Sequence, residues 1–126
     1  MPRILIAEDE EALRAFVARG LTEAGHEVVA VADGAEALER LTAAEGRFDL
    51  LLADIRMPVM DGIALALAAA RDHPALKILL MTGYADQRER ASGLDALIHD
   101  VITKPFSLGA IRNAVNEALV PRFRSS

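Results

Sequence analysis

The chain has 126 residues, 52% of them hydrophobic, and a formal net charge of −5 at pH 7. This length fits one domain with a single buried core. The composition argues against disorder, and no uncharged apolar run approaches the ~20 residues of a membrane span. The acidic balance argues against nucleic acid as the main partner, since phosphate binding calls for a clustered basic surface.

The chain contains no cysteine, which excludes a disulfide framework, a thiol nucleophile and a cysteine-based zinc site. The N-terminal segment reaches an acidic residue at Glu8, too soon for the apolar region of a signal peptide. A cytoplasmic location without membrane insertion fits these features.

Short apolar runs alternate five times with segments of helical periodicity. In the first helical segment the apolar residues recur at helical spacing, which is typical of one apolar helix face: Leu13, Phe16, Val17, Leu21 and Ala24. The expected strands are 3–7, 28–31, 48–53, 78–81 and 101–103. The first expected helix covers 11–24, the second is capped by Asp33, and the third runs from Asp61 to Pro74. The fourth opens with the capping-box pattern of Asp86 and Glu89, and the fifth is capped by Ser107. Alternating strands and helices predict an α/β fold with a parallel sheet covered on both faces. Five units predict an open, doubly wound, five-stranded sheet, because eight would close a barrel.

Polar side chains stand where four of these strands end. The first strand leads to Glu8 and Asp9, the third to Asp54, the fourth to Thr82 and the fifth to Lys104. Ligands of such sheets bind at the carboxyl ends of the strands, so these side chains are expected to converge. Three converging carboxylates would repel one another unless a cation neutralises them, and hard oxygen ligands suit Mg²⁺.

Asp54 follows the apolar run Leu50–Ala53, and a buried carboxylate needs a partner or a chemical role. A carboxylate can act as a nucleophile towards phosphorus and form an aspartyl-phosphate. Lys104 would supply positive charge to the phosphoryl oxygens, and Thr82 a hydroxyl donor. Each residue alone has an ordinary alternative, such as a turn former or a surface amine, but their joint occurrence favours one site.

The segments Ile4–Glu10, Asp54–Gly62, Met81–Gly83 and Lys104–Phe106 resemble the response-regulator receiver domain of two-component signalling. The resemblance runs from about residue 3 to residue 119. It implies a flavodoxin-like (βα)5 receiver over residues 1–120, a short tail at 121–126, and no effector domain.

The same resemblance implies a role for each matching position. Asp54 would be the phosphoacceptor and Asp9 a direct Mg²⁺ ligand. Glu8 would act on the ion through water, and Arg56 would offer it a backbone carbonyl. Asp61 is interpreted separately, as a helix N-cap and not as a site residue.

Two further positions would complete the receiver. Thr82 would be the switch hydroxyl, and Lys104 would pair with the phosphoryl group. The Lys104–Pro105 bond would be cis. Val101 departs from the family, which usually has an aromatic switch residue there, and this leaves open how the signal reaches the surface. Tyr84 could report the state instead, or could be a half-buried loop aromatic.

The segments Phe48–Pro74 and Ile78–Phe106 are also similar to single-domain receivers of alphaproteobacteria that, when unphosphorylated, prepare the ClpXP protease for certain substrates. This likeness implies a histidine kinase or histidine phosphotransferase as phosphodonor and ClpX or ClpXP as partner. It also implies a monomer or weak dimer that catalyses only its own phosphoryl transfer and dephosphorylation.

Three alternatives remain beside this interpretation. One is a phosphate-shuttle or motility-type receiver. A second is a Mg²⁺-dependent aspartyl-phosphate phosphohydrolase, which would usually need an acid where Arg56 stands. A third is a flavin-binding protein, in which Glu8 and Asp9 would repel the phosphate of the cofactor.

Overall fold

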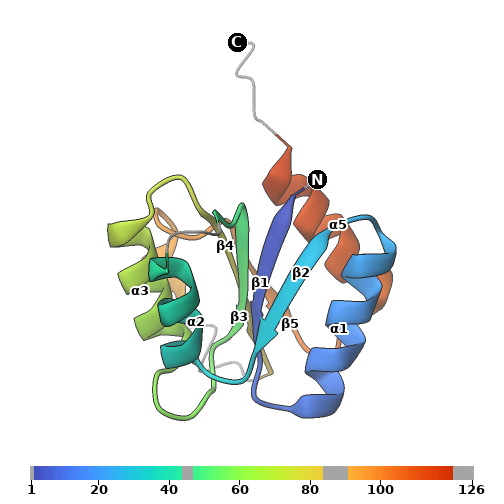
Figure 1. Cartoon of the computed structure of the whole chain (residues 1–126), viewed down its shortest axis with the longest axis horizontal. Coiled ribbons are helices and arrows are strands. Elements are labelled where there is room, and N and C mark those ends of the chain that lie inside the picture. Colours follow the sequence, from blue (N-terminus) through green and yellow to red (C-terminus); the bar gives the residue numbers. More distant parts are fainter. Residues whose placement is uncertain (1, 44–46, 84–90, 121–126) are drawn as a thin grey trace.

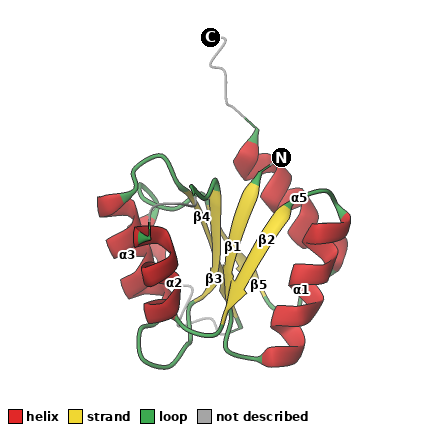
Figure 2. Cartoon of the chain, in the orientation of Figure 1, coloured by secondary structure: helices red, strands yellow, loops and turns green. Residues whose placement is uncertain are grey.

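The computed structural model describes residues 2–43, 47–83 and 91–120, and within them five parallel strands form one sheet in the order β2-β1-β3-β4-β5 (Figures 1 and 2). The strands are β1 (Arg3–Ala7), β2 (Glu27–Val31), β3 (Leu50–Asp54), β4 (Lys77–Thr82) and β5 (Asp100–Thr103). From β1 the chain adds β2 on one side and then β3, β4 and β5 on the other. The predicted doubly wound sheet is confirmed, with its switch point between β1 and β3.

Helices cover both faces of the sheet (Figure 1). The described elements are α1 (Glu11–Glu23), α2 (Gly34–Thr42), α3 (Gly62–Asp72), the 3-10 turn η1 (Ser92–Leu94) and α5 (Leu108–Leu119). Helices α1 and α5 pack on one face, and α2 and α3 pack on the other. None of the helices in these ranges is both long and apolar enough to cross a membrane. The helix expected to open at Asp86 lies outside the described residues, as does Tyr84.

The central strands form the core. All five residues of β3 are buried, and so are four of the five in β1. Their side chains alternate between the faces: Leu51 faces the α2–α3 layer, whereas Leu50 and Leu52 face the α1–α5 layer. A strand that is buried on both faces is largely apolar, which explains why β1 and β3 were readable from the sequence.

Two sequence-based expectations were wrong in detail. Phe16 is 47% exposed, because α1 buries a narrower strip along Val17, Gly20 and Leu21, where it faces α5. Strand β3 begins at Leu50 and not at Phe48, whose ring lies 4.7 Å from the guanidinium carbon of Arg3.

Three predicted N-caps are confirmed. The side chains of Asp33, Asp61 and Ser107 accept hydrogen bonds from backbone N–H groups three residues later, at 2.8, 2.8 and 3.0 Å respectively. These caps fix the first turns of α2, α3 and α5, each of which is the next element after a strand. The loops at the carboxyl edge of the sheet are therefore held by local hydrogen bonds.

Gly62 brings α3 against the end of β3. A Cβ atom at this position would lie 2.3 Å from the backbone oxygen of Asp54. The N–H of Gly62 also donates to the carbonyl of Ile55 at 2.8 Å. The helix can approach the strand end this closely only because residue 62 has no side chain.

Replacing Gly62 by alanine is expected to destabilise the protein by about 1–3 kcal/mol, because the added methyl group must displace the backbone at Asp54. Urea denaturation would measure the loss. The matched control is Gly109→Ala, where the new Cβ would make an ordinary contact at 3.8 Å in the first turn of α5. Equal stability of the two variants would contradict the close approach at Gly62.

Candidate functional site

The strand order brings the predicted site residues to one edge of the sheet. Asp54 is the last residue of β3, Thr82 is the last of β4, and Glu8 and Lys104 directly follow β1 and β5. These four strands are adjacent in the sheet. The register pairs Asp54 with Met81, so Thr82 lies one residue further along the neighbouring strand.

The Lys104 ammonium lies between two carboxylates. Its Nζ is 2.8 Å from Oδ2 of Asp54 and 3.1 Å from Oε1 of Glu8. Glu8 and Asp54 are only 1% and 4% exposed. The backbone N–H of Lys104 also donates to the carbonyl of Thr82 at 2.7 Å, and the Lys104–Pro105 bond is cis as expected. The lysine is thus held by its backbone as well as by its charge.

Burial raises the pKa of Glu8 to about 7, and the nearby charge of Asp54 adds to this effect. The N–H of Glu10, which donates to Oε2 of Glu8 at 3.0 Å, and the Lys104 ammonium act in the opposite direction. Burial alone would lower the pKa of Lys104, but its hydrogen bond and attraction to Asp54, together with Glu8, outweigh burial and raise it. One ammonium therefore compensates the two buried carboxylates only in part.

A third acid completes a cluster suited to a cation. Glu8, Asp9 and Asp54 each offer a carboxylate oxygen, and these oxygens lie within 4.8 Å of one another. Asp9 is exposed, and it lines a cavity of about 500 Å³ together with Asp54, Arg56 and Lys104. Hard oxygen donors that are reachable from solvent are the ligands that Mg²⁺ prefers. The chemistry of this donor set fits that ion.

The structure also describes three other predicted positions, Arg56, Thr82 and Val101. The backbone N–H of Arg56 donates to Oδ1 of Asp54 at 3.3 Å, while the expected role of its carbonyl stays a prediction. The Thr82 side chain is 1% exposed at the end of β4. Val101 is partly buried and packs against the core on the α2–α3 side of the sheet.

Arg14 is a contact of the site that the sequence analysis missed. Its Nη1 donates to the backbone carbonyl of Glu8 at 2.8 Å. The helical pattern places Arg14 on α1 but does not show where its side chain points. No signal in the sequence identified this hydrogen bond, because it depends on how α1 follows the loop.

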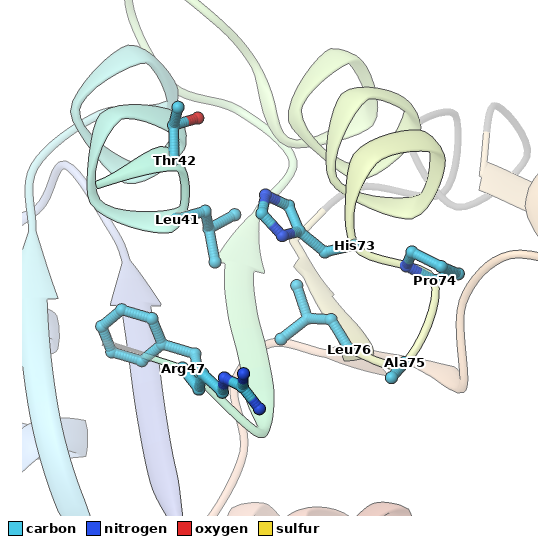
Figure 3. Close-up of a pocket in the computed structure, with 8 residues that line it drawn as sticks. Leu41, Thr42, Arg47, His73, Pro74, Ala75 and Leu76 are labelled. Carbon is cyan, nitrogen blue, oxygen red and sulfur yellow. The ribbon is translucent and has the colours of Figure 1, made fainter. Parts of the chain in front are cut away.

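A second cavity of about 420 Å³ lies at the amino edge of the sheet, between the ends of α2 and α3 (Figure 3). Its basic groups are Arg47 and His73, and its apolar wall includes Leu41 and Leu76. None of the residues lining the cavity is acidic.

Residues 4–116 match the family model of the response regulator receiver domain. The chain is 41% identical over 120 residues to the response regulator receiver protein CpdR of Brucella abortus, covering 95% of this chain and 98% of that protein. It is 37% identical over 117 residues to the sensor kinase CckA of the same organism, covering 92% of this chain but 12% of the kinase. The solved structure of the Thermotoga maritima response regulator TrrA in complex with Mg²⁺-BeF superposes with a TM-score of 0.84 at 28% identity, over 94% of this chain and 100% of TrrA.

Replacing Glu8 by glutamine is expected to stabilise the metal-free protein, because the change removes a buried charge and leaves Lys104 paired with Asp54. At about pH 8 in the presence of a chelator, the free energy of unfolding should rise by about 1–3 kcal/mol. Urea denaturation would measure it. The control is Asp72→Asn, an exposed acid at the far end of α3, which should change stability little.

The pKa of Glu8 also sets a pH dependence. The pKa of Glu8 is about 7 in the folded protein against an ordinary value of 4.5, so the folded state holds the proton more tightly. The stabilisation that comes from this tighter proton binding by Glu8 is fully present below about pH 4.5, and it is lost as the pH rises through about 7. The advantage of Glu8→Gln over the wild type should therefore grow from about pH 5 to about pH 8. Parallel stability curves would contradict this assignment.

Proposed function

The chain belongs to the response-regulator receiver family, and on this premise we propose that it accepts a phosphoryl group on Asp54 from a histidine kinase or histidine phosphotransferase. The observation that carries the proposal is that Asp54, a residue only 4% exposed, contacts Lys104 at 2.8 Å through its carboxylate, beside two further acids. The match to a sensor kinase supports a donor of that class.

In the proposed reaction, an oxygen of Asp54 attacks the phosphorus of a phosphohistidine and forms a P–O bond. The P–N bond breaks, and the imidazole of the donor keeps the electron pair. Both carboxylate oxygens of Asp54 are oriented beforehand, Oδ1 by the N–H of Arg56 and Oδ2 by Lys104. Lys104 then remains beside the site to offset the negative charge of the phosphoryl oxygens.

We assign Mg²⁺ to the acidic cluster. Asp9 and Asp54 would hold the ion directly, Glu8 would act through water, and the backbone carbonyl of Arg56 would complete the protein ligands. When bound, the ion supplies positive charge next to the transferring phosphoryl group. The close approach of the three carboxylates and the Mg²⁺-BeF complex of TrrA support this assignment.

The proposed output is contact with another protein. The Thr82 hydroxyl would turn towards the phosphoryl group, and its backbone link to Lys104 couples the ends of β4 and β5. Similarity to CpdR over nearly its whole length supports a cytoplasmic regulator of ClpXP proteolysis whose unphosphorylated form contacts ClpX. A receiver domain over residues 1–120 would provide this surface, followed by a short tail at 121–126.

Replacing Asp54 by asparagine is expected to abolish phosphorylation, because the amide is a poor nucleophile and carries no charge. The measurement is intact-mass spectrometry after incubation with acetyl phosphate and Mg²⁺, which detects one added phosphoryl group. The control Asp72→Asn should be labelled at the wild-type rate. Labelling of Asp54→Asn at the wild-type rate would show that another residue is the acceptor.

Unphosphorylated protein and Asp54→Ala are expected to capture purified ClpX in a pull-down, and phosphorylated wild type is expected to capture less. The physical reason is that the Thr82 and Lys104 contacts at the phosphoryl group shift the surface between two states. Failure to capture ClpX in both states would contradict the adaptor role while leaving phosphorylation of Asp54 intact, and would favour a shuttle or motility role.

A further inference from the structure

The loop between β1 and α1 carries two of the three acids in the cluster, and it has only three residues, Glu8, Asp9 and Glu10. The two acids differ in their surroundings, since Glu8 is buried and Asp9 is exposed. The direction of each side chain depends on the orientation of the peptide group between them. What holds this peptide group therefore sets where Asp9 offers its oxygens.

Arg14 binds both ends of this loop. Its Nη1 donates to the carbonyl of Glu8 at 2.8 Å, and its backbone N–H donates to the carbonyl of Glu10 at 2.9 Å. The residue is partly buried, although arginine side chains are mostly exposed.

The other groups of Glu8 are held as well. Its N–H donates to the carbonyl of Val31 at 3.1 Å, and its carboxylate accepts from the N–H of Glu10 and from Lys104. Among the hydrogen bonds of the described residues, that of Arg14 reaches the Glu8 carbonyl, which belongs to the peptide group joining Glu8 to Asp9. Losing this hydrogen bond would leave the orientation of that peptide group less restrained.

We propose that Arg14 is a positioning residue, which holds the Glu8–Asp9 peptide group so that the Asp9 carboxylate points into the cation site. The inference rests on the proposed function, because it assigns a role towards the ion that the acidic cluster would hold. Groups that orient metal ligands through hydrogen bonds commonly contribute about 10- to 100-fold to metal affinity.

The sign of the effect separates positioning from simple electrostatics. Arg14 carries a positive charge near a cation site, so removing only its charge would tighten the binding of a divalent cation. Removing the hydrogen bond to the Glu8 carbonyl would instead weaken binding. A purely structural role would lower stability and leave the affinity of the folded protein unchanged.

The test compares wild type with Arg14→Met, which keeps an unbranched apolar stem, and with Arg14→Gln, which keeps a shorter N–H donor. Arg19→Met is the matched control, since Arg19 is an exposed arginine further along α1. Isothermal titration calorimetry with Mg²⁺ should give a dissociation constant at least about 10-fold higher for Arg14→Met, a smaller increase for Arg14→Gln, and no increase for Arg19→Met. Circular dichroism would show that each variant is folded.

A second readout follows phosphorylation by acetyl phosphate as Mg²⁺ is raised. The rate for Arg14→Met should be low at a Mg²⁺ concentration near the wild-type dissociation constant and should approach the wild-type rate at saturation. If Arg14→Met binds Mg²⁺ as tightly as the wild type or more tightly, the positioning role is wrong. The proposed function still stands in that case, provided that the wild-type protein binds Mg²⁺ and is phosphorylated. A wild-type protein that binds no Mg²⁺ and takes up no phosphoryl group would overturn both.

Discussion

Two buried carboxylates, those of Glu8 and Asp54, share one ammonium at the carboxyl edge of the sheet, and the site is organised around this arrangement. Charges in such an environment are tolerated only when they are paired and hydrogen-bonded. Lys104 supplies the pairing for both acids and links the ends of β1, β3 and β5, which lie far apart in the chain. Because one ammonium is shared by two buried carboxylates with a third acid nearby, the pairing leaves part of their negative charge uncompensated.

This uncompensated charge connects stability with chemistry. The raised pKa of Glu8 shows that burial opposes its ionised form. The same uncompensated charge would attract the divalent cation that we propose for the edge of the sheet. A site of this kind is less stable without its ion than an apolar edge would be, and the rigid surroundings keep its acids together in spite of that cost. Gly62 against the backbone of Asp54, the three N-caps and the Arg14 contact are these surroundings.

Much of the fold was predictable because the local signals agree with one another. Buried parallel strands are largely apolar, and the caps at Asp33, Asp61 and Ser107 mark where helices begin. The errors occur where neighbouring elements decide the outcome. Periodicity identifies the centre of the buried face of α1, but only the approach of α5 shows that this face is too narrow to cover Phe16. Strand β3 likewise begins two residues after its predicted start, and the ring of Phe48 lies beside the guanidinium of Arg3 on β1.

By itself, the sequence determined which elements form and which chemical groups stand at the strand ends, because hydrophobic periodicity, capping and turn signals are local. It therefore contained the three acids, the hydroxyl and the amine of the candidate site. Only the tertiary structure decided that Lys104 bridges Glu8 and Asp54, that Glu8 is buried while Asp9 is exposed, and that Arg14 reaches the Glu8 carbonyl. These contacts depend on strand order, register and the path of a short loop, which bring together side chains that no local pattern relates.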